Sequence, residues 1–285
     1  MTTAPVPPGS IVVGVDGSED ADRALVWAVD HARLVNRPLA LVHCAPDTEA
    51  PGILTDAARV VEALDEELEL TVHRLEDDPR DALAELSTRA PLLVMGSRGR
   101  GVFRSALLGS VSASVVRAAA CPVVVCRPDA EIAADSDEPR VVVGSDGSDQ
   151  AGPVLDFAFE QASLRGWPLT VMHCFWDVTA ATVGRGVVPP LPDDGLDDLR
   201  LLLAESVAGF AETYPDVEVT RELARGLVDE CLAGRSTGAS LLVVGRSDPQ
   251  GIDRFLYSSC AVAVLERADT TVAVVPERSY DEAAR

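Results

Sequence analysis

The sequence predicts an α/β protein built from two tandem repeats, each a parallel sheet of five strands with helices on both faces. Strand-like apolar runs alternate with helix-like amphipathic runs along the chain, which is the pattern of parallel α/β folds. The run at 11–18, IVVGVDGS, recurs at 141–148 as VVVGSDGS. An internal repeat of this kind indicates two homologous halves.

In the first repeat, each strand-like run is nearly continuous in Val, Ile and Leu, as in strands buried on both faces. The first helix has its apolar period in Ala21, Leu25 and Ala28, with Ser18 as a plausible N-cap and Asn36-Arg37-Pro38 as its stop. The predicted strands are 10–16, 38–44, 70–76, 91–95 and 122–126, and the predicted helices are 19–35, 54–69, 79–90 and 109–120.

The second repeat follows the same order. Residues 168–174 match 38–44, and residues 241–245 match 92–96 after an insertion. The Pro, Asp and Gly residues of 189–195 predict a long exposed loop within that insertion. The predicted strands are 140–145, 168–174, 216–222, 240–244 and 271–275.

Composition limits the class of protein. The chain has 285 residues, of which 47% are hydrophobic and 25% charged, enough for two buried α/β cores. A net charge of −22 argues against a broad nucleic-acid surface, because phosphates would be repelled. No apolar run reaches membrane-spanning length, and the first ten residues lack the pattern of a secretory signal. We therefore expect a cytoplasmic protein with no nucleic-acid or membrane partner.

The six cysteines occur singly, without a C-x-x-C pair or histidines at zinc spacing, so no metal site is predicted. Four lie in or beside apolar strands, which favours buried free thiols and leaves redox sensing as a minor alternative. His43 and His173 occupy the same place in the two repeats. No serine nucleophile or carboxylate recurs with them, so a structural hydrogen bond is preferred to catalysis.

The segment 96–110, GSRGRGVFRSALLGS, carries the main functional signal. It follows a predicted buried strand and leads into a predicted helix, so glycines are delivered to a helix N-terminus. Glycines allow close backbone approach, and free N–H groups at a helix start favour anions. The segment contains neither a Walker A sequence nor G-x-G-x-x-G, and ordinary loop chemistry is the alternative explanation.

These residues resemble the universal stress protein family in its tandem form. The specific features are the strand ending VGVDGS, the strand ending LVHC, and the ATP-binding pattern G-x2-G-x9-G-S at Gly96, Gly99, Gly109 and Ser110. The resemblance implies doubly wound five-stranded sheets like those of adenine-nucleotide α-hydrolases, with strands one and four adjacent. It also implies a nucleotide-binding domain at 9–128 and a second domain with a degenerate motif at 139–277.

The resemblance further implies an adenine-nucleotide site beyond the carboxyl ends of strands one and four, where the winding reverses. Asp16 would accept a hydrogen bond from the nucleoside, and the N–H groups of Gly99, Gly109, Ser110 and Val111 would donate to phosphate. An Asx turn or N-cap is an alternative role for Asp16, and the two roles are compatible. The site residues expected are Gly14, Val15, Asp16, Cys44, Met95, Gly96, Arg98, Gly99, Gly109, Ser110 and Val111.

Arg98 and Arg100 would add positive charge at this site, although arginines on a solvated loop need no ligand to explain them. The second repeat keeps Gly245 but has Asp248 in place of the second glycine. Pro249 follows, and Ser258 replaces the third glycine. An extra carboxylate, a missing N–H and a Cβ all oppose phosphate binding. Asp146 and Ser259 are retained, which leaves room for a less charged ligand. We expect one nucleotide per chain, in the first domain.

The signals for catalysis are weak. Segment 96–110 has no lysine and no acid, and lysine is absent from the whole chain. We expect a stress-response binding protein for ATP, with or without Mg²⁺, that hydrolyses ATP slowly or not at all and has no catalytic residues. An adenylating enzyme is disfavoured because Asp16-Gly17-Ser18 replaces the S-G-G-x-D-S loop of that class. A scaffold without nucleotide is the other alternative.

The last strands, 122–125 and 271–275, are apolar and expected at sheet edges, where unpaired backbone favours partners. The resemblance implies that the two edges pair with each other around a pseudo-two-fold axis. Segment 127–139 would be an acidic linker. A homodimer is also expected.

Overall fold

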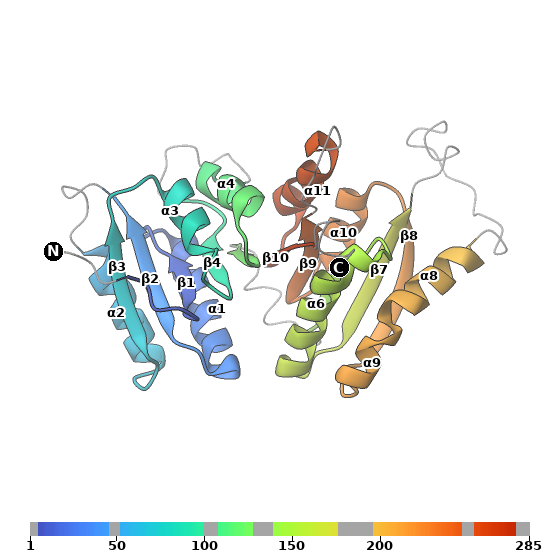
Figure 1. The fold of residues 1–285 in the computed structure, drawn as a ribbon, viewed down its shortest axis with the longest axis horizontal. Helices are drawn as coiled ribbons and strands as arrows, with labels where there is room; N and C mark the ends of the chain where they lie inside the picture. The colour runs from blue at the N-terminus through green and yellow to red at the C-terminus, as the bar shows by residue number, and fades with distance from the viewer. Residues whose placement is uncertain are drawn as a thin grey trace. The chain divides into compact units, whose positions relative to one another are not determined.

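The computed structural model describes residues 5–45, 52–99, 108–127, 139–175, 196–246 and 254–277, with backbone alone at 254–259. Two compact units are present: residues 1–131 with 271–274, and residues 132–270 with 275–285. Both are α/β, with mostly parallel strands flanked by helices (Figure 1), as the sequence predicts.

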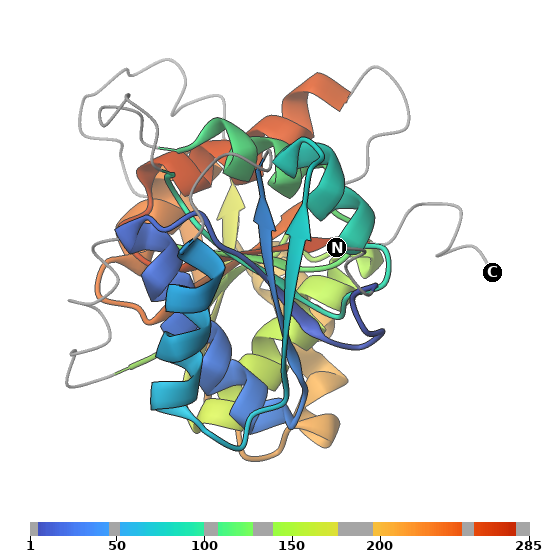
Figure 2. The same cartoon turned by 90° about the vertical axis from the view of Figure 1, so that its left-hand side faces the viewer.

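The first unit has its strands in the order β3-β2-β1-β4-β5, all parallel. β1 lies between β2 and β4, pairing Val13 with Leu41 on one side and Val94 on the other. Figure 2 shows α2 on one side of these strands and α3 on the other. The elements are β1 (Ile11–Gly14), α1 (Glu19–Val35), β2 (Leu39–Cys44), α2 (Ile53–Leu64), β3 (Leu70–Leu75), α3 (Pro79–Leu86), β4 (Leu93–Gly96), α4 (Ser110–Ala118) and β5 (Val123–Cys126).

This order is that of a doubly wound sheet, with the winding reversed between β1 and β4. Parallel strands end together at one sheet edge, so Gly14 at the end of β1 and Gly96 at the end of β4 lie next to the same crevice. The strands themselves form the core: Ile11, Leu41 and Leu93 are fully buried. Burial on both faces explains their continuous apolar sequence.

Helix α1 begins and ends where the sequence predicts. The Ser18 hydroxyl accepts a hydrogen bond from the Ala21 N–H, and Asn36 closes the helix in the left-handed conformation at φ 50°. Helix α2 ends at Leu64, earlier than predicted. Its C-cap, Asp65, accepts hydrogen bonds from the Glu67 N–H and from Arg33, and these polar contacts replace another helical turn.

The second unit has parallel strands in the order β9-β6-β7-β8. Strand β8 begins three residues later than predicted, and residues 189–195, predicted as a loop, lie outside the described residues. The elements are β6 (Val141–Gly144), a 3-10 turn (Asp149–Ala151), α6 (Gly152–Arg165), β7 (Leu169–Phe175), α8 (Asp197–Ala208), α9 (Phe210–Thr213), β8 (Val219–Arg225), α10 (Val228–Ser236), β9 (Leu241–Arg246), α11 (Arg254–Arg267) and β10 (Val272–Pro276).

The beginning of β10 belongs to the first unit. Val272, Ala273 and Val274 pair antiparallel with Val125, Val124 and Val123 of β5. The predicted pairing of the two final strands is therefore present. Most of the predicted linker, residues 128–138, lies outside the described residues.

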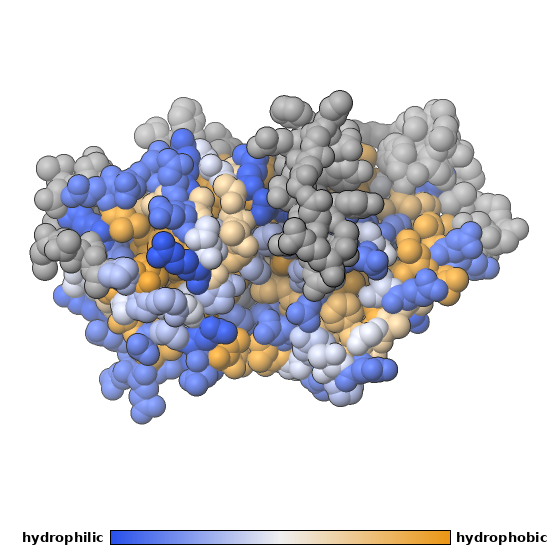
Figure 3. Space-filling model, viewed as in Figure 1, coloured by the Kyte–Doolittle hydropathy of each residue, from blue (hydrophilic) through white to orange (hydrophobic). Residues whose placement is uncertain are grey.

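Figure 3 shows hydrophilic residues over much of the visible face, with apolar areas between them. Across the described helices, none combines the length and the apolar character that a bilayer crossing requires.

Candidate functional site

A cavity of about 610 Å³ lies at the carboxyl ends of β1, β2 and β4 in the first unit. Every residue that the sequence predicts for the nucleotide site lines this cavity. Its volume falls within the range of small-molecule pockets, roughly 300–1,000 Å³. The lining residues that the sequence analysis missed are Ala21, Val42, His43, Pro79, Leu83, Leu108 and Ser112.

Asp16 stands at the cavity in the turn between β1 and α1. Gly17 makes this turn at φ +75°, a conformation that favours glycine. Asp16 Oδ1 accepts from the Ser18 N–H at 3.0 Å and from the Ser18 hydroxyl at 2.6 Å. This Asx turn confirms the alternative role considered for Asp16. The other carboxylate oxygen faces the glycine loop, because a Cβ built on Gly99 would lie 2.5 Å from Asp16 Oδ2.

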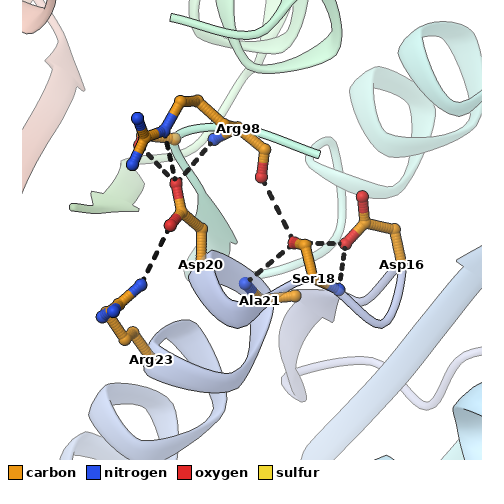
Figure 4. Close-up of polar contacts among 7 residues, drawn as sticks. Asp16, Ser18, Asp20, Ala21, Arg23 and Arg98 are labelled. Carbon is orange, nitrogen blue, oxygen red and sulfur yellow. Dashed lines mark hydrogen bonds and ion pairs between the residues drawn. The ribbon is translucent and has the colours of Figure 1, made fainter. Parts of the chain in front are cut away.

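A buried carboxylate holds the loop after β4. Asp20, in the first turn of α1, is 5% exposed, and its Oδ2 accepts from the Ser97 hydroxyl at 2.8 Å. The same oxygen accepts from the Arg98 N–H at 3.1 Å and from Arg98 Nε at 3.2 Å, while Arg23 pairs with Oδ1 at 3.0 Å (Figure 4). The Arg98 guanidinium is therefore engaged within the protein. Arg100 lies outside the described residues.

Gly96 is required by the close approach of β4 to α1. A Cβ at this position would lie 2.7 Å from the Asp20 carbonyl carbon and 2.9 Å from the Ala21 nitrogen. Real Cβ atoms do not approach backbone this closely, so a side chain would push the strand from the helix. The two glycines therefore have different neighbours: Gly96 lies against the backbone of α1, and Gly99 lies against Asp16 in the turn before α1.

The N-terminus of α4 forms another wall. Sequence reasoning assigned the Gly109 N–H to phosphate, and this is corrected: that N–H donates to the Ser97 carbonyl at 2.8 Å. The Ser112 hydroxyl donates to the Gly96 carbonyl at 2.9 Å. Both bonds tie α4 to the end of β4. The N–H groups of Ser110 and Val111 lie in the first turn of α4 and have no acceptor within the helix. Such a helix N-terminus favours a bound anion.

His43 adds a polar group to the cavity. Its Nδ1 lies 2.7 Å from the Val15 carbonyl and therefore carries the proton as donor, which is the predicted structural hydrogen bond. In a neutral imidazole with this tautomer, Nε2 is an acceptor. The side chain is 8% exposed, and Nε2 has no hydrogen-bond partner among the described residues. Buried polar atoms without a partner are rare in folded proteins, and His43 is one of the residues that line the cavity.

Two further side chains lie near the cavity. Burial, reinforced by the charges of Asp77 and Asp78, raises the pKa of the Cys44 thiol to about 11, so Cys44 is a neutral wall residue at neutral pH. Arg80, the second residue of α3, places Nη2 3.4 Å from the Ser110 hydroxyl. Arg80 was missed by the sequence analysis, because it belongs to no motif and is thirty residues from Ser110.

The second unit keeps the frame of the site. Asp146 Oδ1 accepts from the Ser148 N–H at 2.8 Å, and His173 Nδ1 lies 3.0 Å from the Ser145 carbonyl, as in the first unit. The carboxylate of Glu277 is the nearest group to a Cβ built on Gly245, so this glycine faces an acid. Asp248 and Pro249 lie outside the described residues, and Ser258 and Ser259 are described as backbone only.

The cysteines are free thiols. Cys121 and Cys126 are buried, whereas Cys44, Cys174 and two others are half-buried, so burial is less complete than predicted. Within the described ranges, no three His, Cys, Asp or Glu side chains are arranged to hold a metal ion.

The fold and cavity define a tandem α/β protein with a glycine-lined pocket at the switch point of its first sheet. The family model of the universal stress protein family matches residues 9–127 and 139–276. A universal stress protein of Mycobacterium tuberculosis is 34% identical, covering 93% of this chain and 96% of that protein. One from Mycolicibacterium smegmatis is 35% identical, covering 94% and 97%. The chain therefore belongs to the universal stress protein family.

Solved structures show the same fold. A universal stress protein from Archaeoglobus fulgidus superposes with a TM-score of 0.66 at 19% identity, covering 95% of this chain and 99% of that one.

Proposed function

We propose that the protein is an adenine-nucleotide-binding universal stress protein that takes one nucleotide per chain, in the cavity of its first domain. The main support is the convergence of complementary groups on that cavity. It has a carboxylate at Asp16, an imidazole at His43 and helix N–H groups at Ser110 and Val111. Acceptors suit the hydroxyl and amine donors of a nucleoside, and the N–H groups suit phosphate oxygens.

We further propose that binding, with slow or no hydrolysis, is the biochemical activity, and that ATP is the ligand, with or without Mg²⁺. Among the described cavity residues, Asp16 is the one carboxylate and Arg98 the one arginine, and the latter is held by Asp20. This set gives little support for the charge neutralisation that rapid phosphoryl transfer needs. A regulatory role in the cytoplasm and a homodimeric state complete the proposal, and cell fractionation and light scattering test them.

The test is calorimetric titration of the full chain with ATP, ADP and AMP, together with a long incubation that measures released phosphate. We expect saturable binding near one nucleotide per chain and very slow phosphate release. No binding of any adenine nucleotide would favour a scaffold function. Pyrophosphate release dependent on a second substrate would favour an adenylating enzyme.

A further inference from the structure

We propose that Arg80, rather than Arg98, contacts the phosphate groups of a nucleotide bound in the first-domain cavity. This inference rests on the proposed nucleotide site. The two arginines then have different roles: Arg98 positions the start of the loop after β4, and Arg80 sets the preference for phosphorylated ligands. The sequence suggested the opposite, because Arg98 lies inside the glycine motif and Arg80 does not.

One edge of the Arg98 guanidinium already has a partner within the protein. Its Nε and its backbone N–H both donate to Asp20 Oδ2, an oxygen that also accepts from Ser97. Because Asp20 is buried, separating the two groups would leave a buried carboxylate with one charged partner fewer, which is costly. Arg98 is thus a positioning residue that holds the residues directly after β4 against the first turn of α1 (Figure 4).

Arg80 is placed differently. Asp78 caps α3 and accepts from the Arg80 N–H at 2.9 Å, and Pro79, which lines the cavity, directly precedes Arg80. The side chain is exposed and reaches across to α4, where Nη2 lies 3.4 Å from the Ser110 hydroxyl. No carboxylate of the described residues forms an ion pair with its guanidinium.

These positions put a guanidinium beside the first-turn N–H groups of α4. The helix end and the arginine favour an anion at the same place, and the planar guanidinium can donate two parallel hydrogen bonds to a phosphate. His43, whose Nε2 is buried without a hydrogen-bond partner among the described residues, lines another wall of the same cavity. A nucleotide would therefore meet Arg80 with its phosphates, and a nucleoside without phosphate would not.

The experiment measures Kd for ATP and for adenosine in wild type, Arg80→Gln, Arg80→Lys and Arg89→Gln. Arg89 is an exposed arginine just after α3 and makes the same change of charge away from the cavity. For Arg80→Gln we expect ATP to bind about fivefold more weakly, with a smaller dependence on salt, while adenosine binding and the urea midpoint stay unchanged. Arg80→Lys should recover part of the loss, and Arg89→Gln should match wild type.

Equal ATP affinity in wild type and Arg80→Gln would overturn the inference while leaving the proposed function intact. Equal weakening of ATP and adenosine would also overturn it, because the effect would not involve phosphate. A wild-type protein that binds neither ligand would instead overturn the proposed function, and the inference with it. Arg98→Gln provides a contrast: we expect it to lower the urea midpoint and to weaken both ligands.

Discussion

Alanine at position 99 would bring a methyl group 2.5 Å from Asp16 Oδ2, about 1 Å closer than ordinary contact. The carboxylate is the movable end of a side chain, so it would retreat and the fold would persist. Retreat strains the two hydrogen bonds that Asp16 Oδ1 accepts from Ser18. It also withdraws the acceptor that we propose for the nucleoside.

The size of this effect follows from the hydrogen bonds involved. Loss of one or two hydrogen bonds between Asp16 and the nucleoside, at about 1 kcal/mol each, corresponds to a Kd for ATP roughly fivefold to thirtyfold higher. Gly96→Ala should act on stability instead of ligand binding, because its Cβ would meet backbone atoms of Asp20 and Ala21, which cannot move aside as a side chain can. Overpacking of this kind costs about 1–3 kcal/mol, so we expect a lower free energy of unfolding for Gly96→Ala.

Calorimetric titration and urea denaturation of both variants measure these two effects. Gly234→Ala is the control, since a Cβ built on Gly234 in α10 meets nothing within 4 Å. The reasoning is refuted if Gly99→Ala binds ATP as tightly as wild type while folding normally. A Gly96→Ala protein as stable as wild type would refute the explanation of the first glycine.

Three further predictions concern stability and thiol chemistry. Ser18→Ala removes the N-cap of α1 and should lower the free energy of unfolding by about 1 kcal/mol in urea titrations, whereas Ser148→Ala, whose side chain makes no cap hydrogen bond, should change it little. With a pKa of about 11, Cys44 should react with a thiol reagent at pH 8 about a hundredfold more slowly than an exposed cysteine, and ATP should slow it further; peptide mapping that finds rapid labelling of Cys44 would contradict this. Burial raises the pKa of Cys121 and of Cys126 from 9.0 to about 12, so the folded state disfavours their ionisation. The free energy of unfolding should therefore be highest below pH 9 and should fall, for each thiol, by up to about 1.4 kcal/mol per pH unit between pH 9 and 12. Urea midpoints measured across that range should show a smaller slope for Cys126→Ala.

Much of the first domain could be predicted because its signals are local. The cap at Ser18, the stop at Asn36 and the continuous apolar strands each depend on neighbouring residues, and the structure has them as predicted. The site residues that the family resemblance implied all line one cavity. The pairing of the final strands was also predicted, from the family resemblance.

The remaining features depend on side chains that meet across the fold. Nothing in the sequence indicates that Asp20 bonds Arg98, or that Arg80 reaches Ser110. The role of the Gly109 N–H was predicted wrongly. This N–H donates to the carbonyl of Ser97, which lies twelve residues earlier in the chain, so local sequence gave no sign of the bond. His43 was correctly expected to make a structural hydrogen bond, but its second nitrogen became a candidate ligand group only once burial was known.

The claim that one of two similar domains binds the nucleotide is tested most directly by a matched pair of variants. Asp16 and Asp146 occupy the same position in the two repeats, and each accepts a hydrogen bond from the serine N–H two residues later. The measurement is the amount of adenine nucleotide bound per chain at saturation in wild type, Asp16→Ala and Asp146→Ala. We predict about one nucleotide per chain in wild type and Asp146→Ala, and little in Asp16→Ala. Two nucleotides per chain in wild type, or loss of binding in Asp146→Ala alone, would contradict the account.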